Sequence, residues 1–351
     1  MTVSIADYLK VVTADMSLAL VSANALSKIE TLAKNLPPLA IAAFECRLQP
    51  DNSRVDFSVS LPFMTINPPT LWLSHPVWQS IQKLSQEWVV SSYDLRGIID
   101  RNWLEFDLTD SCGSILVPCL AFSLNQTTFN DPQLWRKVTQ FLFNIQNHSH
   151  PQPLQKKLNH CLKCLPENAR ISHIGAMLSR PTKPIRLVVT GIAPKEITNY
   201  LNQVGWTDNN QELSLLIETL ATAVDSISLA FDVEEEIAPT IGLECYFNRS
   251  AFNEKEWKSF LDNYLIPYDL CTRQKRSALL EWIGISDRFT HPQLWPHNLT
   301  FLDFLLGNRY HVFFNRTINH IKLVYQPGEP LLAKAYLFFQ YFHIKINNHE
   351  L

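Results

Sequence analysis

The sequence predicts an α+β fold in which a ten-stranded antiparallel β-barrel, built from five ββ hairpins, is surrounded by a ring of α-helices. Five pairs of strand-like segments recur along the 351 residues, and helical sequence separates each pair from the next. Because such a chain buries its apolar faces well by closing the strands inside the helices, the strands would leave no exposed sheet edge. We therefore expect a single domain over residues 1–351 that repeats a unit of helices and two strands, of the ααββ type.

Periodicity and turn residues place two hairpins in the first third of the chain. Residues 4–35 carry apolar side chains at helical spacing, and Pro37 and Pro38 end that segment. A second helix is expected from about 74 to 90, because Pro76 falls in its first turn. The strands are expected at residues 40–48, 54–61, 102–108 and 114–124, with turns at 50–53 and 110–113.

Three more hairpins follow, again with helices between them. Helix starts are expected near Asp131, Pro194 and Asn253, and further helices at 153–165, 211–224 and 273–283. Residues 284–318 are expected to be irregular with short helical pieces. The six strands are expected at 169–179, 184–192, 226–233, 239–247, 319–325 and 331–342.

The alternation of each strand predicts which side chains line the barrel lumen. If helices cover the outside, the outer face must be apolar and the polar set must point inward. Between residues 54 and 61, for example, Val55, Phe57 and Val59 share one face, and Asp56 and Ser58 share the other. The same rule places these residues in the lumen: Glu45, Arg47, Arg54, Asp56, Ser58, Ser60, Trp103, Glu105, Asp107, Arg186, Val188, Thr190, Asp232, Glu244, Tyr246, Lys322, Lys334, Tyr336 and Phe338.

A charged and aromatic lumen indicates a site, because buried charges are costly unless they are paired or used. The basic side chains are expected to converge on one anion, the aromatic ones suit contact with a cation, and Glu45 is the candidate base. The candidate site residues are Glu45, Arg47, Arg54, Trp103, Arg186, Glu244, Tyr246, Lys322, Lys334 and Tyr336. Alternatively the charges pair with one another, Arg47 with Asp56 for instance, in a barrel that does no chemistry.

The order of elements resembles the prenyltransferase barrel of the ABBA superfamily of aromatic and peptide prenyltransferases, and the resemblance covers most of the chain. Lys334-Ala-Tyr336 matches the Lys-x-Tyr pattern of that family, and Glu45 with Arg47 or Arg54 lies where its base and first basic residue occur. The resemblance implies that the lumen Arg and Lys residues hold a prenyl diphosphate, that tyrosines shield the allylic cation, and that Glu45 takes a proton from the acceptor.

The sequence also departs from that pattern. The fourth hairpin reads Glu244-Cys-Tyr246, with an acid in the place of the expected base, and the second, with Glu105 and Asp107, offers no basic lumen residue. The surplus carboxylates suit either Mg²⁺ on the diphosphate or a cationic acceptor such as a guanidinium. The helical isoprenyl synthase class is unlike this chain, because no Asp-Asp-x-x-Asp motif is present.

Composition and charge indicate which kinds of partner and which cell compartment to expect. The net charge of −3 gives no general attraction to nucleic acid, and no apolar run approaches the ~18 residues of a membrane span. Asp7, Lys10 and Asp15 break any secretory signal near the start, and seven scattered cysteines fit reduced thiols, so we expect a cytoplasmic protein. Neither Rossmann nor P-loop glycine motifs occur. Oligomeric state is not encoded in any pattern found here.

Two lesser patterns have ordinary structural explanations. Cys161 and Cys164 form a lone CxxC beside His160, which lacks the second ligand pair of a zinc site. Tryptophans near helix starts, Trp78, Trp135 and Trp257, are expected to pack helices on the barrel rather than contact a ligand.

The expected function is transfer of a prenyl group from an allylic prenyl diphosphate to an aromatic small molecule or peptide side chain, as in peptide modification or natural product biosynthesis. The alternative is a non-catalytic barrel that binds a peptide or small ligand as the partner of a biosynthetic pathway. A catalytic barrel needs an open cavity with converging basic residues and a nearby glutamate, whereas a scaffold would fill that space with its own side chains.

Overall fold

The structure of the chain is a computed structural model, and it describes residues 4–38, 41–50, 52–61, 68–89, 95, 97–108, 115–125, 131–148, 151–207, 210–248, 252–306 and 310–345. The turn expected at 110–113 lies outside these residues. The described strands are β1 (Ile41–Arg47), β2 (Val55–Leu61), β3 (Ile99–Phe106), β4 (Cys119–Leu124), β5 (Arg170–Ala176), β6 (Ile185–Thr190), β7 (Ser226–Val233), β8 (Ile237–Tyr246), β9 (Gly284–Asp287), β10 (Tyr310–Tyr325) and β11 (Leu332–Lys345).

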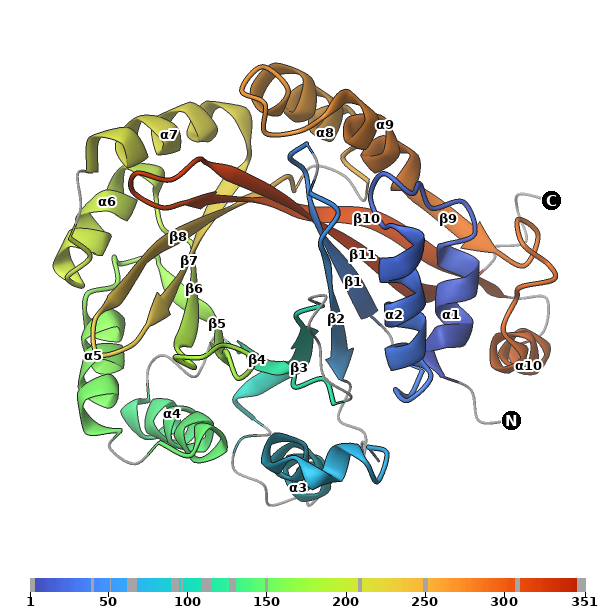
Figure 1. The fold of residues 1–351 in the computed structure, drawn as a ribbon, viewed down its shortest axis with the longest axis horizontal. Coiled ribbons are helices and arrows are strands. Elements are labelled where there is room, and N and C mark those ends of the chain that lie inside the picture. Colours follow the sequence, from blue (N-terminus) through green and yellow to red (C-terminus); the bar gives the residue numbers. More distant parts are fainter. Residues whose placement is uncertain are drawn as a thin grey trace.

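Ten of these strands close into an antiparallel barrel, as the sequence predicts (Figure 1). Their order is β11-β1-β2-β3-β4-β5-β6-β7-β8-β10, and pairing between β10 and β11 completes the ring. Each hairpin therefore lies beside the next one along the chain, and the last returns to the first. Closure pairs both edges of every barrel strand over part of its length and leaves a central hollow inside the ring.

Helices surround the barrel in the order of the chain (Figure 1). None of the described helices is both long and apolar enough to cross a membrane. The described helices are α1 (Ile5–Val12), α2 (Ala23–Ala33), η1 (Trp72–Ser74), α3 (Pro76–Val89), α4 (Pro132–Gln146), α5 (Gln152–Lys163), α6 (Pro194–Gln203), α7 (Asn210–Ala223), α8 (Glu254–Phe260), η3 (Leu261–Leu265), α9 (Arg273–Trp282) and α10 (His297–Leu306).

The outer face of the barrel is the main hydrophobic core. Phe44 of β1 and Phe57 of β2 are fully buried, and the ring of Phe44 meets Trp282 of α9 at a centroid distance of 5.8 Å. Trp78 of α3 stacks on Phe106 of β3 at a centroid distance of 6.2 Å. Apolar side chains thus point outward on each strand, and the alternate side chains point into the lumen.

The N-terminal segment forms two helices, α1 and α2. The prediction of one helical segment over 4–35 is therefore wrong for the residues between them. Thr13 ends α1, and its hydroxyl donates to the carbonyl of Leu9 at 2.7 Å. Ser22 begins α2 as a cap, because its hydroxyl accepts a hydrogen bond from the backbone nitrogen of Ala25 at 3.2 Å. Short hydroxyl side chains compete with the backbone in this way and interrupt helices despite apolar periodicity.

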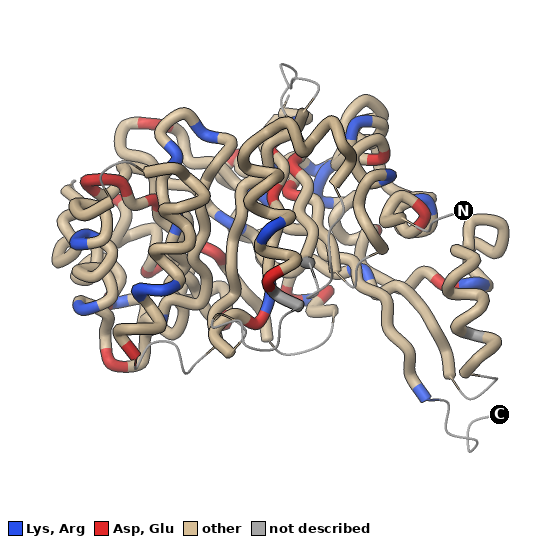
Figure 2. The backbone as a smooth tube through the Cα atoms, turned by 90° about the horizontal axis from the view of Figure 1, so that it is seen from below, with Lys and Arg blue, Asp and Glu red and all other residues tan. Residues whose placement is uncertain are grey.

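Residues 284–318 are also more regular than the sequence predicts, because they contain β9, α10 and the first half of β10. Here β10 and β11 continue beyond the ring as a ribbon, and β9 pairs with Phe313–Arg316 of β10 (Figure 2). This part of β10 does not alternate cleanly, since Val312, Phe313 and Phe314 are all buried. A strand with apolar residues on both faces cannot be recognised by alternation.

Candidate active site

The lumen contains two neighbouring cavities. The first, of about 520 Å³, is called the charged chamber here, and Arg47, Arg54, Asp56 and Lys334 are among the side chains that line it. The second, of about 650 Å³, is called the aromatic chamber, and Trp103, Tyr246, His320 and Phe338 are among its lining residues. Four residues line both chambers, and the place where they lie is called the constriction here: Ser58, Glu105, Arg186 and Tyr336.

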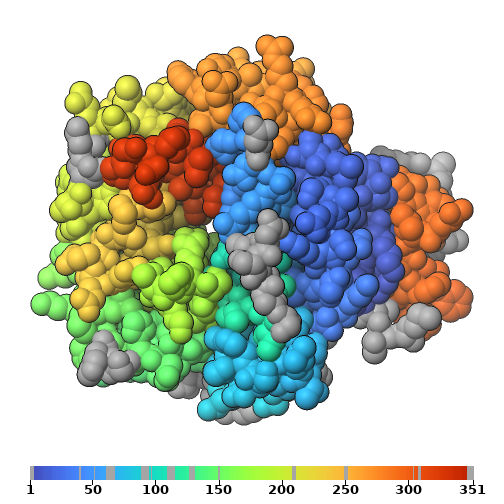
Figure 3. All heavy atoms as spheres, in the orientation of Figure 1, coloured from blue at the N-terminus to red at the C-terminus, as the bar shows by residue number. Residues whose placement is uncertain are grey.

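The lumen is therefore hollow, and Figure 3 shows the barrel face hollowed where early, middle and late parts of the chain meet. All ten candidate site residues from the sequence line one chamber or both. The charged chamber holds Glu45, Arg47, Arg54 and Lys334, and the aromatic chamber holds Trp103, Glu244, Tyr246 and Lys322, while Arg186 and Tyr336 belong to both.

Strand register brings these side chains together from distant parts of the sequence. Glu45 of β1 is paired with Tyr336 of β11 on one side and with Asp56 of β2 on the other. Lys322 of β10 is paired with Lys334 of β11 and with Glu244 of β8. Directly opposed side chains on one face of a sheet lie close enough to interact, so the register decides which charges meet.

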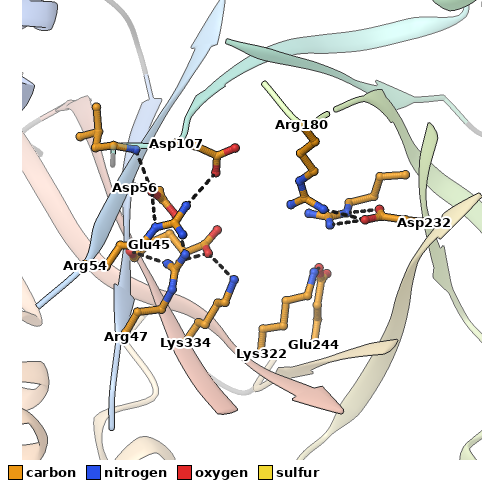
Figure 4. Close-up of polar contacts among 12 residues, drawn as sticks. Glu45, Arg47, Arg54, Asp56, Asp107, Arg180, Asp232, Glu244, Lys322 and Lys334 are labelled. Atoms are coloured by element: carbon orange, nitrogen blue, oxygen red, sulfur yellow. Dashed lines mark hydrogen bonds and ion pairs between the residues drawn. The ribbon is translucent and has the colours of Figure 1, made fainter. Parts of the chain in front are cut away.

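One network of ion pairs lies on strands β1, β2, β3 and β11, and we call it the first wall (Figure 4). Arg47 contacts Asp56 at 2.5 Å and Glu45 at 2.8 Å. Lys334 contacts Glu45 at 2.9 Å. The partly exposed Arg54 lies between Asp56 and Asp107, at 3.4 and 3.5 Å. The first wall consists of Glu45, Arg47, Arg54, Asp56, Asp107 and Lys334, which are three cations and three carboxylates.

The second wall lies on β6, β7, β8 and β10, with one residue from the turn after β5 (Figure 4). Arg186 contacts Asp232 through two nitrogens at 2.8 and 2.9 Å, and Arg180 adds a third contact at 2.6 Å. Lys322 contacts Glu244 at 3.2 Å. The second wall consists of Arg180, Arg186, Asp232, Glu244 and Lys322, which are three cations and two carboxylates.

These contacts keep the paired lumen groups charged. Burial disfavours the carboxylate of Glu45, but Lys334 and Arg47 outweigh it and hold the pKa of Glu45 well below its ordinary value. Burial opposes the charge of Glu244 as well, yet Lys322 and a hydrogen bond from Tyr246 help to lower its pKa to about 2. The pKa of Arg186 lies well above its ordinary value, because Asp232 overcomes the effect of burial.

An aromatic stack lies beside Lys322 and Glu244. The ring of His320 stacks on Tyr336 at a centroid distance of 4.0 Å and lies 5.0 Å from Tyr246. Burial lowers the pKa of His320 to about 4, so its imidazole is neutral near pH 7. Trp103 faces Phe338 at 5.6 Å across the same chamber. Neutral ring faces of this kind attract a cation and exclude water from it.

Sequence reasoning missed several lumen residues, and two of them, Arg180 and His320, belong to the contacts described above. Arg180 was expected only in a hairpin turn, where no alternation indicates direction, and its contact with Asp232 depends on closure of the barrel. His320 lies two residues before Lys322, so strand alternation alone would place both side chains on the lumen face. A register shift between Ile318 and His320 comes just before this part of the strand. Gly242 of β8 also matters, because a side chain there would collide with Lys322.

The lesser sequence patterns are structural. Trp78, Trp135 and Trp257 are buried between helices and barrel, which confirms their expected packing role. Cys164 lies near His160, with its sulfur 3.7 Å from Nδ1, while Cys161 is buried. Among the described residues, no three His, Cys, Asp or Glu side chains are grouped so that they would hold a metal ion.

Comparison with known proteins identifies the architecture. No protein-family model and no curated protein sequence matches the chain. The structure is similar to 5-dimethylallyltryptophan synthase from Streptomyces coelicolor, with 11% identity and a TM-score of 0.50 over 95% of each chain. A structure of that synthase in complex with DMASPP and Trp gives 11% identity and a TM-score of 0.51, over 95% of this chain and 93% of the other. The closed ten-stranded barrel of this protein is thus a prenyltransferase barrel.

Proposed function

We propose that the protein transfers a prenyl group from an allylic prenyl diphosphate to an aromatic small molecule or a peptide side chain inside the lumen. The observation that carries this proposal is the hollow lumen, in which cations from both walls adjoin a chamber of aromatic rings. A barrel that bound no ligand would have no reason to keep this space open. The similar barrel with DMASPP and Trp bound adds support at the level of the fold.

The diphosphate would bind where positive charge exceeds negative charge. On the second wall, Arg180 and Arg186 share Asp232, and Lys322 has Glu244, so one cation is in excess. Arg186 also lines the constriction, next to Tyr336. Charge-assisted hydrogen bonds from these groups would stabilise the diphosphate as its bond to the allylic carbon breaks.

The allylic cation would form beside the aromatic stack. Tyr336 lines both chambers, and His320 and Tyr246 continue the stack into the aromatic chamber. Their ring faces would shelter the cation from water until the acceptor attacks. A neutral His320 suits this role, because an imidazolium would repel the cation.

Magnesium has no clear protein site in this lumen. The carboxylates of both walls are engaged by arginine or lysine, and the described residues contain no group of three side chains suited to a metal ion. The residues therefore do not fit a protein-bound metal, and every step of the proposal depends on the chain's own cations.

The second candidate function is a non-catalytic barrel that binds a peptide or small ligand. Internal pairing favours it, because Arg47 and Lys322 each have a carboxylate partner within 3.2 Å. In a catalytic barrel, an arriving diphosphate must share those cations with their carboxylates, which weakens its binding. Turnover distinguishes the two candidates.

The test is incubation of the protein with dimethylallyl, geranyl or farnesyl diphosphate and with tryptophan, tyrosine or peptides that contain them. Mass spectrometry should detect the acceptor plus one prenyl group. Lys334→Ala should lower the yield of this product, because Lys334 lies in the charged chamber, whereas Lys83→Ala on the exposed face of α3 should not. Binding of a ligand without any prenylated product would favour the second candidate.

A further inference from the structure

Glu105 lies at the constriction, where the charged chamber and the aromatic chamber share lining residues. It lies on β3, paired with Ser58 of β2 and Cys119 of β4, and its side chain lines the charged chamber and the aromatic chamber alike. The other charged residue at this constriction is Arg186 of the second wall. A molecule that occupied both chambers would therefore have Glu105 beside it.

Glu105 also differs from the lumen carboxylates of the two walls. Glu45, Asp56, Asp232 and Glu244 each contact an arginine or lysine nitrogen at 3.2 Å or less. Glu105 makes no ion pair within 4.0 Å and no hydrogen bond with any residue that the structure describes. Its two oxygens are free to accept a proton or a hydrogen bond from a bound molecule.

The surroundings of Glu105 make it a stronger base than Glu45. Burial raises its pKa, Glu45 and Asp107 add to this effect, and Arg186 and Lys322 reduce it in part. The pKa of Glu105 is raised above its ordinary value of 4.5, whereas that of Glu45 lies well below the same value. Tyr336 is the other titratable group at the constriction, and burial keeps its phenol protonated.

We propose that Glu105 is the residue that accepts the proton from the prenyl acceptor, at the point where the two chambers meet. This inference rests on the proposed function. The bond between the allylic carbon and the diphosphate oxygen breaks, and diphosphate leaves with the electron pair. An electron pair of the acceptor forms the new bond to the allylic carbon, and the acceptor's proton passes to a carboxylate oxygen of Glu105.

Position explains why Glu105 suits this step better than Glu45. The acceptor enters the aromatic chamber, and the diphosphate is held by Arg186 and its neighbours, so the reacting carbon lies at the constriction. Glu45 lines only the charged chamber and is held by Lys334 and Arg47 at 2.9 and 2.8 Å. The role of Glu45 is then to fix those two cations, which makes it a positioning residue.

The test compares Glu105→Gln with Glu45→Gln and follows two products, the prenylated acceptor and the released diphosphate. A general base accelerates a reaction by about 10²- to 10⁴-fold, so Glu105→Gln should lower the rate of prenyl transfer by at least about 100-fold. It should still release diphosphate, because ionisation of the donor does not need the base and water then captures the cation. Glu105→Asp should recover part of the transfer, and Glu45→Gln should raise KM for the donor.

The outcomes separate the two levels of the hypothesis. Transfer by a folded Glu105→Gln variant within about threefold of the wild-type rate overturns the role of Glu105. If the wild type yields neither product with any donor, the proposed function itself fails, and the role of Glu105 fails with it. Continued release of diphosphate with transfer lost supports both.

A pH profile of the wild type gives a second measurement if the variant does not fold. A base must be deprotonated to act, so transfer should rise with pH through the pKa of Glu105, with a midpoint above pH 4.5. The charged groups that set this midpoint are Glu45, Asp107, Arg186 and Lys322. A midpoint below 4.5 would assign the proton to Glu45 and overturn the proposal.

Discussion

The two walls of the lumen carry similar residues but differ in how their charges are balanced. The first wall has as many carboxylates as cations, and Glu45 and Asp56 are each shared by two cations. On the second wall, Asp232 is shared by two arginines while Lys322 has Glu244, which leaves one cation in excess. The first wall is therefore a self-sufficient network, and the second offers an anion a better place to bind.

The largest expected effect comes from removing a cation of the second wall. Arg186→Gln takes away the guanidinium at the constriction, and we expect kcat/KM for the donor to fall by about 100-fold or more. Arg54→Gln on the first wall is the matched change, because Arg47 still neutralises Asp56. It should cost about tenfold or less in kcat/KM, since the Arg54 side chain is 43% exposed and its contacts are long.

Equal losses in the two variants would contradict the difference between the walls. Thermal unfolding of both proteins is the control, because Arg186→Gln removes one of the two arginines that contact Asp232 and leaves Arg180. A loss of kcat/KM that follows a loss of folded protein would report stability and not donor binding. Steady-state kinetics at several donor concentrations separates KM from kcat.

A lysine outside the lumen supports the first wall. Among the residues that the structure describes, no such lysine supports the second wall. Lys275 of α9 donates to the backbone carbonyls of Arg47, Gln49 and Asn52 at 2.9, 2.8 and 2.7 Å and so clamps the β1–β2 turn. Lys275→Met should lower the free energy of unfolding by about 3 kcal/mol, because buried carbonyls lose a charged donor. Urea denaturation measures this change.

The control for Lys275→Met is Lys255→Met on the exposed face of α8, which should change stability by less than about 0.5 kcal/mol. The clamp also places Arg47 at the end of β1, so the folded Lys275→Met protein should bind the donor less well. A variant with wild-type stability and wild-type KM would show that the β1–β2 turn holds its shape without the lysine.

A smaller effect is expected from crowding the second wall without removing any charge. A methyl group at Gly242 would meet the side chain of Lys322, whose flexible end must then move away from Glu244. Gly242→Ala should raise KM for the donor by roughly tenfold, and it should also lower stability, because the buried ion pair of Lys322 with Glu244 is disturbed. Gly97→Ala is the control, because nothing lies near its added methyl group, and an unchanged KM for Gly242→Ala would argue that Lys322 does not bind the donor.

Much of this site was predictable, because strand alternation depends on local sequence. The rule that outer faces are apolar placed Glu45, Arg186 and Lys334 in the lumen, and they line its chambers. The ion pairs were harder to predict from the sequence. Arg180 contacts Asp232, for example, only because closure of the barrel sets the register of the strands. The ribbon at β9 and β10 was missed because Val312, Phe313 and Phe314 bury both faces of the strand.

The last expected effect is a pH dependence of stability that belongs to the second wall and its aromatic stack. His320 has a pKa of about 4 in the folded protein against an ordinary value of 6.5, so only the unfolded chain binds its proton between these values. Glu244, with a pKa of about 2 against 4.5, behaves likewise at lower pH. The free energy of unfolding should therefore fall as the pH is lowered, first from 6.5 to 4 and then from 4.5 to 2.

Variants assign each window to its residue. His320→Gln should flatten the dependence between pH 6.5 and 4, whereas His343→Gln on the exposed end of β11 should not. Glu244→Gln should flatten only the lower window, although it also leaves Lys322 without its carboxylate and so lowers stability at every pH. Urea denaturation at a series of pH values measures both slopes. Burial also lowers the pKa of His173, so part of the upper window should remain in His320→Gln. A window as steep in His320→Gln as in the wild type would mean that His320 takes up its proton in the folded protein, and the cation shelter of the aromatic chamber would lose its neutral member.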